Sequence, residues 1–242
     1  TFAETNLGVG WYYFNKGDNA LAFDHFRQAL ELNRDGYMVN RDAGAFLRSI
    51  GLYKQALRYL GRASRLSPTD IEPLVQIAQC WYYLGRSEKA LAYTRKALKI
   101  QAGNPQALFL HISLLSLIGR DDEAESQIKA MERFDISNPR LPFFREMVAA
   151  LRDGRGRPYA FVGDSPSISP QGTYLYLGFD MKEEALANIR KGIEEGFKTD
   201  GTYYYSYPSL VNNPLYKDLR GDPRFKEILK RQKEAYIREL RA

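Results

Sequence analysis

Residues 8–30 read GVGWYYFNKGDNALAFDHFRQAL, and the spacing of small residues in this stretch recurs along the chain. Gly17 divides it into two segments whose large apolar residues follow a helical period. Glycines stand at 34-residue intervals, alanines follow each of them five residues later, and a further small or apolar residue follows after seven more: Gly17, Gly51, Gly85, Gly119; Ala22, Ala56, Ala90, Ala124; Ala29, Ala63, Ala97, Met131. Three registers in phase over four copies predict a repeated helical hairpin.

The small residues have a physical reason in such a hairpin. Two antiparallel helices approach closely only where side chains are small, as at Gly10, Gly44 and Ala78 on the first helix of three copies. A glycine between the helices can adopt the left-handed conformation that ends a helix without strain. We therefore expect Gly17 and its three counterparts to have positive φ angles.

This pattern resembles that of the tetratricopeptide-repeat (TPR) family, W-x2-L-G-x2-Y, then A-x3-F, then P, on a period of 34 residues. The match is best at Gly10, Tyr13, Ala22 and Phe26 in the first copy, and at Gly44, Ala56, Ala63 and Pro68 in the second. The chain departs from the pattern at the tryptophan position, which holds Asn6, Asn40, Leu74 and Leu108, and at Thr94, where the family has an aromatic residue. The resemblance implies an all-α fold, an α-solenoid wound as a right-handed superhelix, over residues 3–138.

We expect four repeats at about 3–36, 37–70, 71–104 and 105–138, followed by less regular segments. Residues 139–152 form an additional helix, 153–172 an irregular loop rich in Gly, Pro and Ser, and 173–198 a divergent fifth helical hairpin. Residues 199–242 contain a Tyr-rich segment (Tyr203, Tyr204, Tyr205, Tyr207) and C-terminal capping helices. The tyrosines either form an interaction surface or, as we favour, help to seal the last hairpin.

Two Asx-Pro pairs, Asn213-Pro214 and Asp222-Pro223, mark helix starts in this C-terminal part, since each places a capping residue before a proline at the first helical position. The run from Leu219 to Phe225, LRGDPRF, is similar to an LRxDPRF-like terminator of bacterial TPR proteins.

Composition argues against several functional classes. The net charge is +6 with a pI near 9.2, but acidic and basic residues are interspersed, so we expect no nucleic-acid binding. No apolar run is long enough to span a membrane. The chain begins at Thr1 rather than Met, so we expect a processed or excised piece; the cytoplasm is favoured, but localisation is open because an upstream targeting segment is possible. The sequence does not predict an oligomeric state.

The residues that usually carry chemistry do not form a catalytic or metal site. His25 and His111 lie in different repeats, and Cys80 lies on a helix beside Trp81, where a buried thiol is expected. The glycines and arginines of residues 154–157 lack the strand and helix of a phosphate-binding loop. We therefore expect no enzyme activity, no cofactor and no metal.

A ligand-binding groove is expected along the first helices, on the side away from their small residues. The predicted groove residues mix aromatic, amide and arginine side chains: Leu7, Trp11, Phe14, Arg41, Arg48, Gln76, Gln79, Tyr83 and Phe109. A peptide with apolar or aromatic character and some acidic groups would suit Arg41 and Arg48. The TPR proteins that clamp the acidic tail of heat-shock chaperones carry basic residues and an asparagine where this chain has Leu7, Trp11, Glu72 and Gln76, so that ligand is not expected.

The predicted function is therefore a protein–protein interaction scaffold that binds a peptide or partner protein in the concave groove. The alternative is a regulatory or sensory segment of a larger enzyme or transcription regulator, which the terminator-like run and the missing start methionine suggest. Nucleic-acid binding by an α-solenoid is a third hypothesis, which is less favoured.

Overall fold

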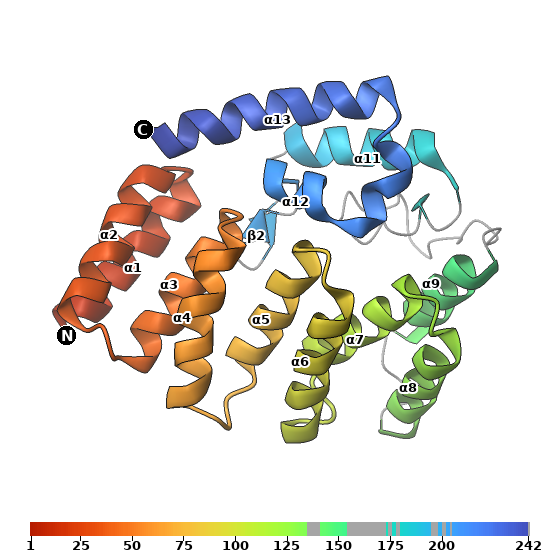
Figure 1. Ribbon diagram of the computed structural model, residues 1–242, viewed down its shortest axis with the longest axis horizontal. Helices are drawn as coiled ribbons and strands as arrows, with labels where there is room; N and C mark the ends of the chain where they lie inside the picture. The colour runs from red at the N-terminus through yellow and green to blue at the C-terminus, as the bar shows by residue number, and fades with distance from the viewer. Residues whose placement is uncertain are drawn as a thin grey trace.

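The computed structural model describes residues 1–134, 141–153, 173, 176–177, 180–194, 198–199, 202–203 and 205–241. Four antiparallel helix pairs follow one another: α1 (Phe2–Lys16) and α2 (Asn19–Leu32), α3 (Tyr37–Ser49) and α4 (Tyr53–Leu66), α5 (Glu72–Tyr83) and α6 (Ser87–Ile100), α7 (Pro105–Leu117) and α8 (Asp121–Phe134). They stack side by side into a curved row (Figure 1). The expected all-α solenoid is confirmed.

The turn glycines have the predicted backbone conformation. Gly17, Gly51, Gly85 and Gly119 have φ angles of 86°, 83°, 69° and 74°. In the first turn, the amide of Gly17 donates to the carbonyl of Phe14 at 3.0 Å, which satisfies a carbonyl at the end of α1. A residue with a Cβ would be strained at each of these positions.

Small residues also bring the two helices of a pair together as expected. A Cβ on Gly10 would lie 3.0 Å from Cε2 of Phe26, and one on Gly44 would lie 2.7 Å from Cγ of Leu60. Phe26 and Leu60 are both buried and belong to one continuous core through the repeats. Glycine at these positions therefore allows a large side chain of the second helix to pack directly on the backbone of the first.

Two asparagines that stand at the tryptophan position of the TPR pattern, Asn6 and Asn40, make side-chain hydrogen bonds. Asn40 is buried, and its side-chain amide donates to the carbonyls of Arg34 and Gly36 at 2.8 Å each. Asn6 Oδ1 lies 2.9 Å from Nδ1 of His25. At both positions a hydrogen-bonded polar side chain thus stands where the TPR pattern has a tryptophan, although Oδ1 of the buried Asn40 has no partner among the described residues.

Helix α9 (Leu141–Asp153) continues the solenoid. It packs against both α7 and α8, as the first helix of a further repeat would, and buries Leu141, Phe144 and Val148. This is the expected additional helix. The expected loop at 153–172 lies outside the described residues, except for Asp153 at the end of α9.

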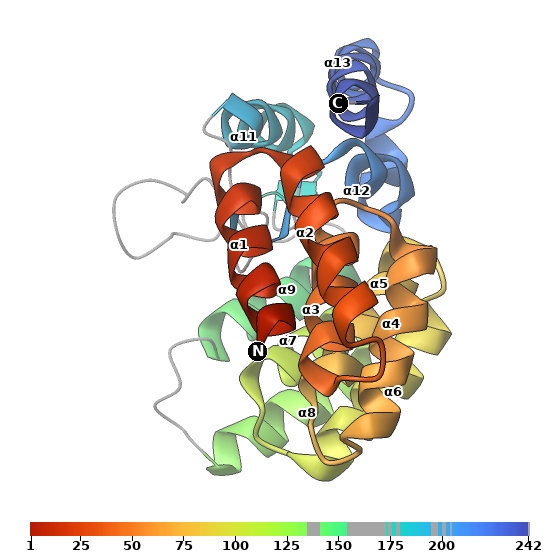
Figure 2. The ribbon, with the colours of Figure 1, turned by 90° about the vertical axis from the view of Figure 1, so that its left-hand side faces the viewer.

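Helix α11 (Lys182–Glu194), in the expected fifth hairpin, does not extend the row after α9. It lies beside α13 (Pro223–Arg241) in a second layer across the ends of the repeats (Figures 1 and 2). The physical reason is the composition of its buried side, where Leu186 and Ile189 form a separate core with residues of the C-terminal segment: Tyr205, Leu210, Tyr216, Leu219, Phe225 and Ile228.

Short elements complete this second layer, which we call the C-terminal layer. Strands β1 (Lys198–Thr199) and β2 (Thr202–Tyr203) pair antiparallel, and α12 (Tyr207–Asn212) and the 3-10 helix η1 (Pro214–Leu219) lead into α13. Asp222 starts α13 as expected, because its Oδ1 accepts from the backbone amide of Arg224 at 2.8 Å. Leu219 and Phe225, at the two ends of the LRGDPRF run, are fully buried.

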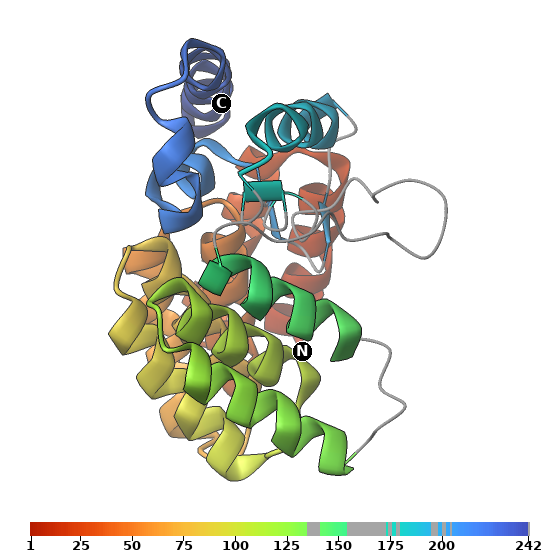
Figure 3. The ribbon, with the colours of Figure 1, turned by 90° about the vertical axis from the view of Figure 1, so that its right-hand side faces the viewer.

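The C-terminal layer also covers the edge of the solenoid where the first and second helices of the first three repeats meet (Figures 1 and 3). Pro208 of α12 lies against Gly51, and the hydroxyl of Tyr82 donates to Oδ1 of Asn213 at 2.7 Å. Helix α13 reaches α2, where Tyr236 and Asn19 line the same small crevice. The segment expected to cap one hairpin therefore also spans the turns of the first three repeats.

Candidate binding surface

The inner face of the solenoid is formed by the first helix of each repeat. α1 packs against α3, α3 against α5, α5 against α7, and α7 against α9. In stacked helical hairpins, the helices that contact their counterparts in successive repeats line the inner side of the curve. The residues predicted to bind a ligand all lie on these helices.

A chain of polar contacts joins three of the first helices on this face. The indole Nε1–H of Trp11 donates to Oδ2 of Asp42 at 3.3 Å, and Nε of Arg41 donates to Oδ1 of the same carboxylate at 2.7 Å. Arg41 Nη1 lies 3.6 Å from Glu72 Oε2, and Gln76 Nε2 donates to Glu72 Oε1 at 3.1 Å. Because these contacts link α1, α3 and α5, they fix the side chains of the inner face relative to one another.

The charges in this network are balanced locally. Burial by itself lowers the pKa of Arg41, but its hydrogen bond to Asp42 and the charges of Asp42 and Glu72 raise it overall. Tyr37, whose hydroxyl donates to Asp70 and whose ring lies 5.7 Å from the Arg41 guanidinium, has its pKa raised to about 12, mainly by burial and then by that hydrogen bond. Arg41 is therefore a paired cation rather than a free one.

Four of the nine predicted groove residues are partly exposed: Trp11, Arg41, Gln79 and Phe109. They come from four successive first helices, so together they mark an accessible strip along the inner face, which we call the inner strip. Its chemistry is aromatic at both ends, with an amide and a paired arginine between them.

The other five predicted groove residues are buried in the structure, which corrects the expectation that they face a ligand: Leu7, Phe14, Arg48, Gln76 and Tyr83. Phe14 packs edge-on to Trp11 and Phe46, with ring centroids 5.6 and 5.8 Å apart, and Tyr83 stacks on Tyr53 at 5.1 Å. These rings contribute to the packing between repeats.

The end of the inner face next to the turns is covered by the C-terminal layer. Strand β2 lies against α3, and α12 lies against α5. Arg48 and Ser49, in the last turn of α3, are buried at this end of the inner face. This cover is not apparent from the repeat pattern, which gives no signal for the position of the C-terminal layer.

Two residues of the polar network, Asp42 and Glu72, were not among the predicted site residues. A signal for both was available. Asp42 follows Arg41 directly. Glu72 lies 31 residues after Arg41, which is close to one repeat length, so the stacking of successive first helices brings Glu72 near Arg41. Pairing of Arg41 could therefore have been anticipated from the repeat register.

The two histidines and the cysteine that were considered as reactive groups pack against neighbouring side chains. His25 stacks on Tyr13 with ring centroids 5.5 Å apart, and His111 Nδ1 lies 2.7 Å from the hydroxyl of Thr94. Burial lowers the pKa of His111 to about 4 and raises the pKa of the Cys80 thiol to about 12. A thiol in this state is not a nucleophile at neutral pH.

Within the described ranges, no three His, Cys, Asp or Glu side chains gather closely enough to hold a metal ion. No helix in that part of the chain combines the length and the apolar character needed to cross a bilayer.

Comparisons with known proteins agree with this architecture. The tetratricopeptide-repeat family model matches residues 3–35, which correspond to the first helix pair. No curated protein matches the sequence. The run from Leu219 to Phe225 stays a predicted terminator, since its resemblance is not tested by these comparisons.

Several solved structures share the fold. A tetratricopeptide repeat protein from Parabacteroides merdae aligns with a TM-score of 0.58 at 17% identity, over 94% of this chain and 97% of that one. MamA protein aligns with 0.54 at 14% identity, over 82% and 97%. A thermophilic TPR protein of Thermus thermophilus aligns with 0.50 at 18% identity, over 94% and 98%. The chain thus has the fold of TPR solenoids, which typically serve as protein–protein interaction scaffolds.

Proposed function

We propose that this chain is a non-catalytic scaffold that binds an extended segment or a helix of a partner protein along the inner strip. The observation that carries the proposal is the polar network from Trp11 to Gln76, which holds the inner face in one arrangement while leaving part of it accessible. A surface that is already ordered loses little conformational entropy when a partner binds.

The chemistry of the strip suggests what the partner segment contains. Trp11 and Phe109 provide partly exposed aromatic surface, and Gln79 provides an amide that can both donate and accept. Arg41 already has Asp42 and Glu72 as partners, and Arg48 is buried. The expectation of an acidic ligand at these two arginines is therefore replaced by a segment with apolar and neutral polar side chains.

The proposal can be tested by photo-crosslinking. A benzophenone amino acid placed at Gln79, on the first helix of the third repeat, should capture a partner from the native organism. The same residue placed at Gln55, which is exposed on the second helix of the second repeat, serves as the matched control. We expect a discrete adduct from position 79 that is absent at position 55. Capture at position 55 and not at 79 would place the binding surface on the outer face.

A further inference from the structure

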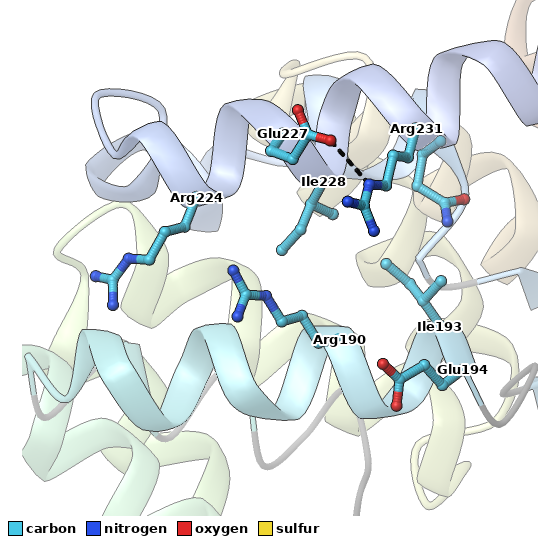
Figure 4. A pocket seen from close by; sticks show the side chains of 8 residues that line it. Arg190, Ile193, Glu194, Arg224, Glu227, Ile228 and Arg231 are labelled. Atoms are coloured by element: carbon cyan, nitrogen blue, oxygen red, sulfur yellow. Dashed lines mark hydrogen bonds and ion pairs between the residues drawn. The ribbon is translucent and has the colours of Figure 1, made fainter.

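A cleft opens between α11 and α13, in the C-terminal layer and away from the inner strip. It has a volume of about 400 Å³, which is the size of a site for a few residues of peptide or a small ligand. Its lining combines three arginines with two glutamates, two isoleucines and a glutamine: Arg190, Ile193, Glu194, Arg224, Glu227, Ile228, Arg231 and Gln232 (Figure 4).

The base of this cleft is apolar. Ile228 projects from α13 toward α11 and is buried, while Ile193 of α11 is partly exposed (Figure 4). Both side chains belong to the second core, so their positions are fixed by packing below them. An aliphatic side chain placed on them would remove further apolar surface from water.

Two of the three arginines are held in place by carboxylates. Arg224 Nη2 donates to Asp222 Oδ2 and to Glu183 Oε1 at 2.7 Å each. Arg231 Nε donates to Glu227 Oε1 at 2.8 Å. These contacts orient the guanidinium groups but offset much of their charge.

Arg190 differs from both. Its side chain extends from α11 toward α13, between Arg224 and Ile228 (Figure 4), and it makes no hydrogen bond or ion pair with any described residue. Its field reaches Glu183, whose pKa is lowered chiefly by the hydrogen bond from Arg224 and to a smaller extent by Arg190. The guanidinium of Arg190 thus lies beside the apolar base of the cleft, and its hydrogen-bond donors have no partner among the described residues.

Glu194, one helical turn further along α11, gives the cleft a polarity. It also has no ion pair or hydrogen bond within the described part of the chain, and it lies next to Ile193 at the end of α11 (Figure 4). A ligand that fits both groups carries a negative charge at one end, an apolar middle, and a neutral or positive group at the other end. Polyanions such as nucleic acids fit poorly, because Glu194 and Glu227 would repel them.

We propose that this cleft binds a short acidic and apolar segment of a partner protein. A carboxylate of the segment accepts hydrogen bonds from the unpaired Arg190, and the neighbouring aliphatic side chains rest on Ile193 and Ile228. A guanidinium and a carboxylate can form two parallel hydrogen bonds, which gives both strength and orientation. This site goes beyond the proposed function, since it lies on another layer and takes the acidic ligand that the paired Arg41 does not.

The test uses a fluorescein-labelled peptide with the sequence Gly-Glu-Leu-Leu-Lys-Gly, titrated into the full chain. Two comparison peptides replace the glutamate with glutamine or both leucines with serine. We expect Arg190→Gln to weaken binding of the glutamate peptide by about tenfold and to abolish the preference over the glutamine peptide. Lys191→Gln is the matched control, because it removes the same charge from the same helix at an exposed residue outside the cleft.

Isoleucine methyl signals in NMR spectra locate the binding. The peptide should shift the Ile193 and Ile228 methyl signals, and the serine peptide should not. The proposal is overturned by no binding up to about 1 mM, by equal weakening in Lys191→Gln, or by inorganic phosphate that shifts the same methyls as strongly as the peptide does. None of these results bears on the inner strip, whose test uses position 79 and a different ligand.

Discussion

The hydroxyl of Tyr82, at the end of α5, donates a hydrogen bond of 2.7 Å to Oδ1 of Asn213, which lies 131 residues further along the chain. Both side chains are buried, so this contact joins the third repeat to the C-terminal layer in a place that water does not reach. The repeats and the C-terminal layer are therefore expected to unfold together.

Tyr82→Phe removes the donor and leaves the Asn213 carbonyl oxygen without it. We expect the free energy of unfolding to fall by about 0.5–1.5 kcal/mol, since the buried pair loses one hydrogen bond. Urea denaturation followed by circular dichroism measures the change. Tyr12→Phe is the control, because that ring is 57% exposed. Equal stability of the two variants would show that the contact does not contribute to docking.

Gly192, on α11, lies directly beneath the ring of Tyr205. A Cβ there would approach Cδ2 of that ring to 2.7 Å, and the ring is fixed by burial and by its hydroxyl, 2.9 Å from the Thr173 hydroxyl. We expect Gly192→Ala to lower the melting temperature, at a cost of about 1–3 kcal/mol for overpacking. Gly8→Ala, in α1 with nothing near its Cβ, should instead raise stability by up to about 1 kcal/mol through helix propensity.

The buried His111 predicts a loss of stability in mild acid. Its pKa is lowered from 6.5 to about 4, chiefly by burial and then by Arg95, with Arg120 acting in the same direction and Glu123 against it. Between these values the unfolded chain binds a proton that the folded chain does not, so stability is complete above about pH 6.5 and declines toward pH 4. The decline attributable to this group is on the order of 3 kcal/mol.

His111→Gln separates this contribution from the carboxylates that titrate in the same range. The free energy of unfolding should be measured at several pH values for both proteins, and the difference between their slopes is the readout. We expect a shallower slope for the variant between pH 6.5 and 4. Parallel curves would mean that His111 is protonated equally in both states.

Cys80 should resist thiol reagents while the chain is folded. Its thiol is fully buried and its pKa is raised to about 12 from 9.0, mainly by burial, so little thiolate exists at neutral pH. Ellman's reagent is expected to react with this single cysteine only after denaturant is added. Rapid reaction of the native protein would show that α5 opens locally.

The repeat itself was predictable from sequence because its determinants are local. The left-handed turn glycines and the small residues at Gly10 and Gly44 act within one helix pair, and a period of 34 residues fixes their register. The helix start at Asp222 was predictable for the same reason, since a capping side chain and a following proline act over a few residues.

The position of the C-terminal layer was not predictable in the same way. It depends on contacts between residues far apart in sequence, such as Tyr82 with Asn213 and Gly51 with Pro208, for which the repeat pattern gives no signal. That layer covers Arg48 and the end of the inner face next to the turns. The groove predicted from the sequence was therefore larger than the inner strip that the structure leaves accessible.

The central claim, that the inner strip receives the partner, is tested most directly by the affinity of the captured partner for two matched variants. Gln79→Arg adds bulk and charge on the inner strip, and Gln55→Arg adds the same side chain to an exposed site on a second helix. Isothermal titration should show at least about tenfold weaker binding for Gln79→Arg, and wild-type affinity for Gln55→Arg, with unchanged circular dichroism for both. Wild-type affinity for Gln79→Arg together with weakened binding for Gln55→Arg would contradict the account.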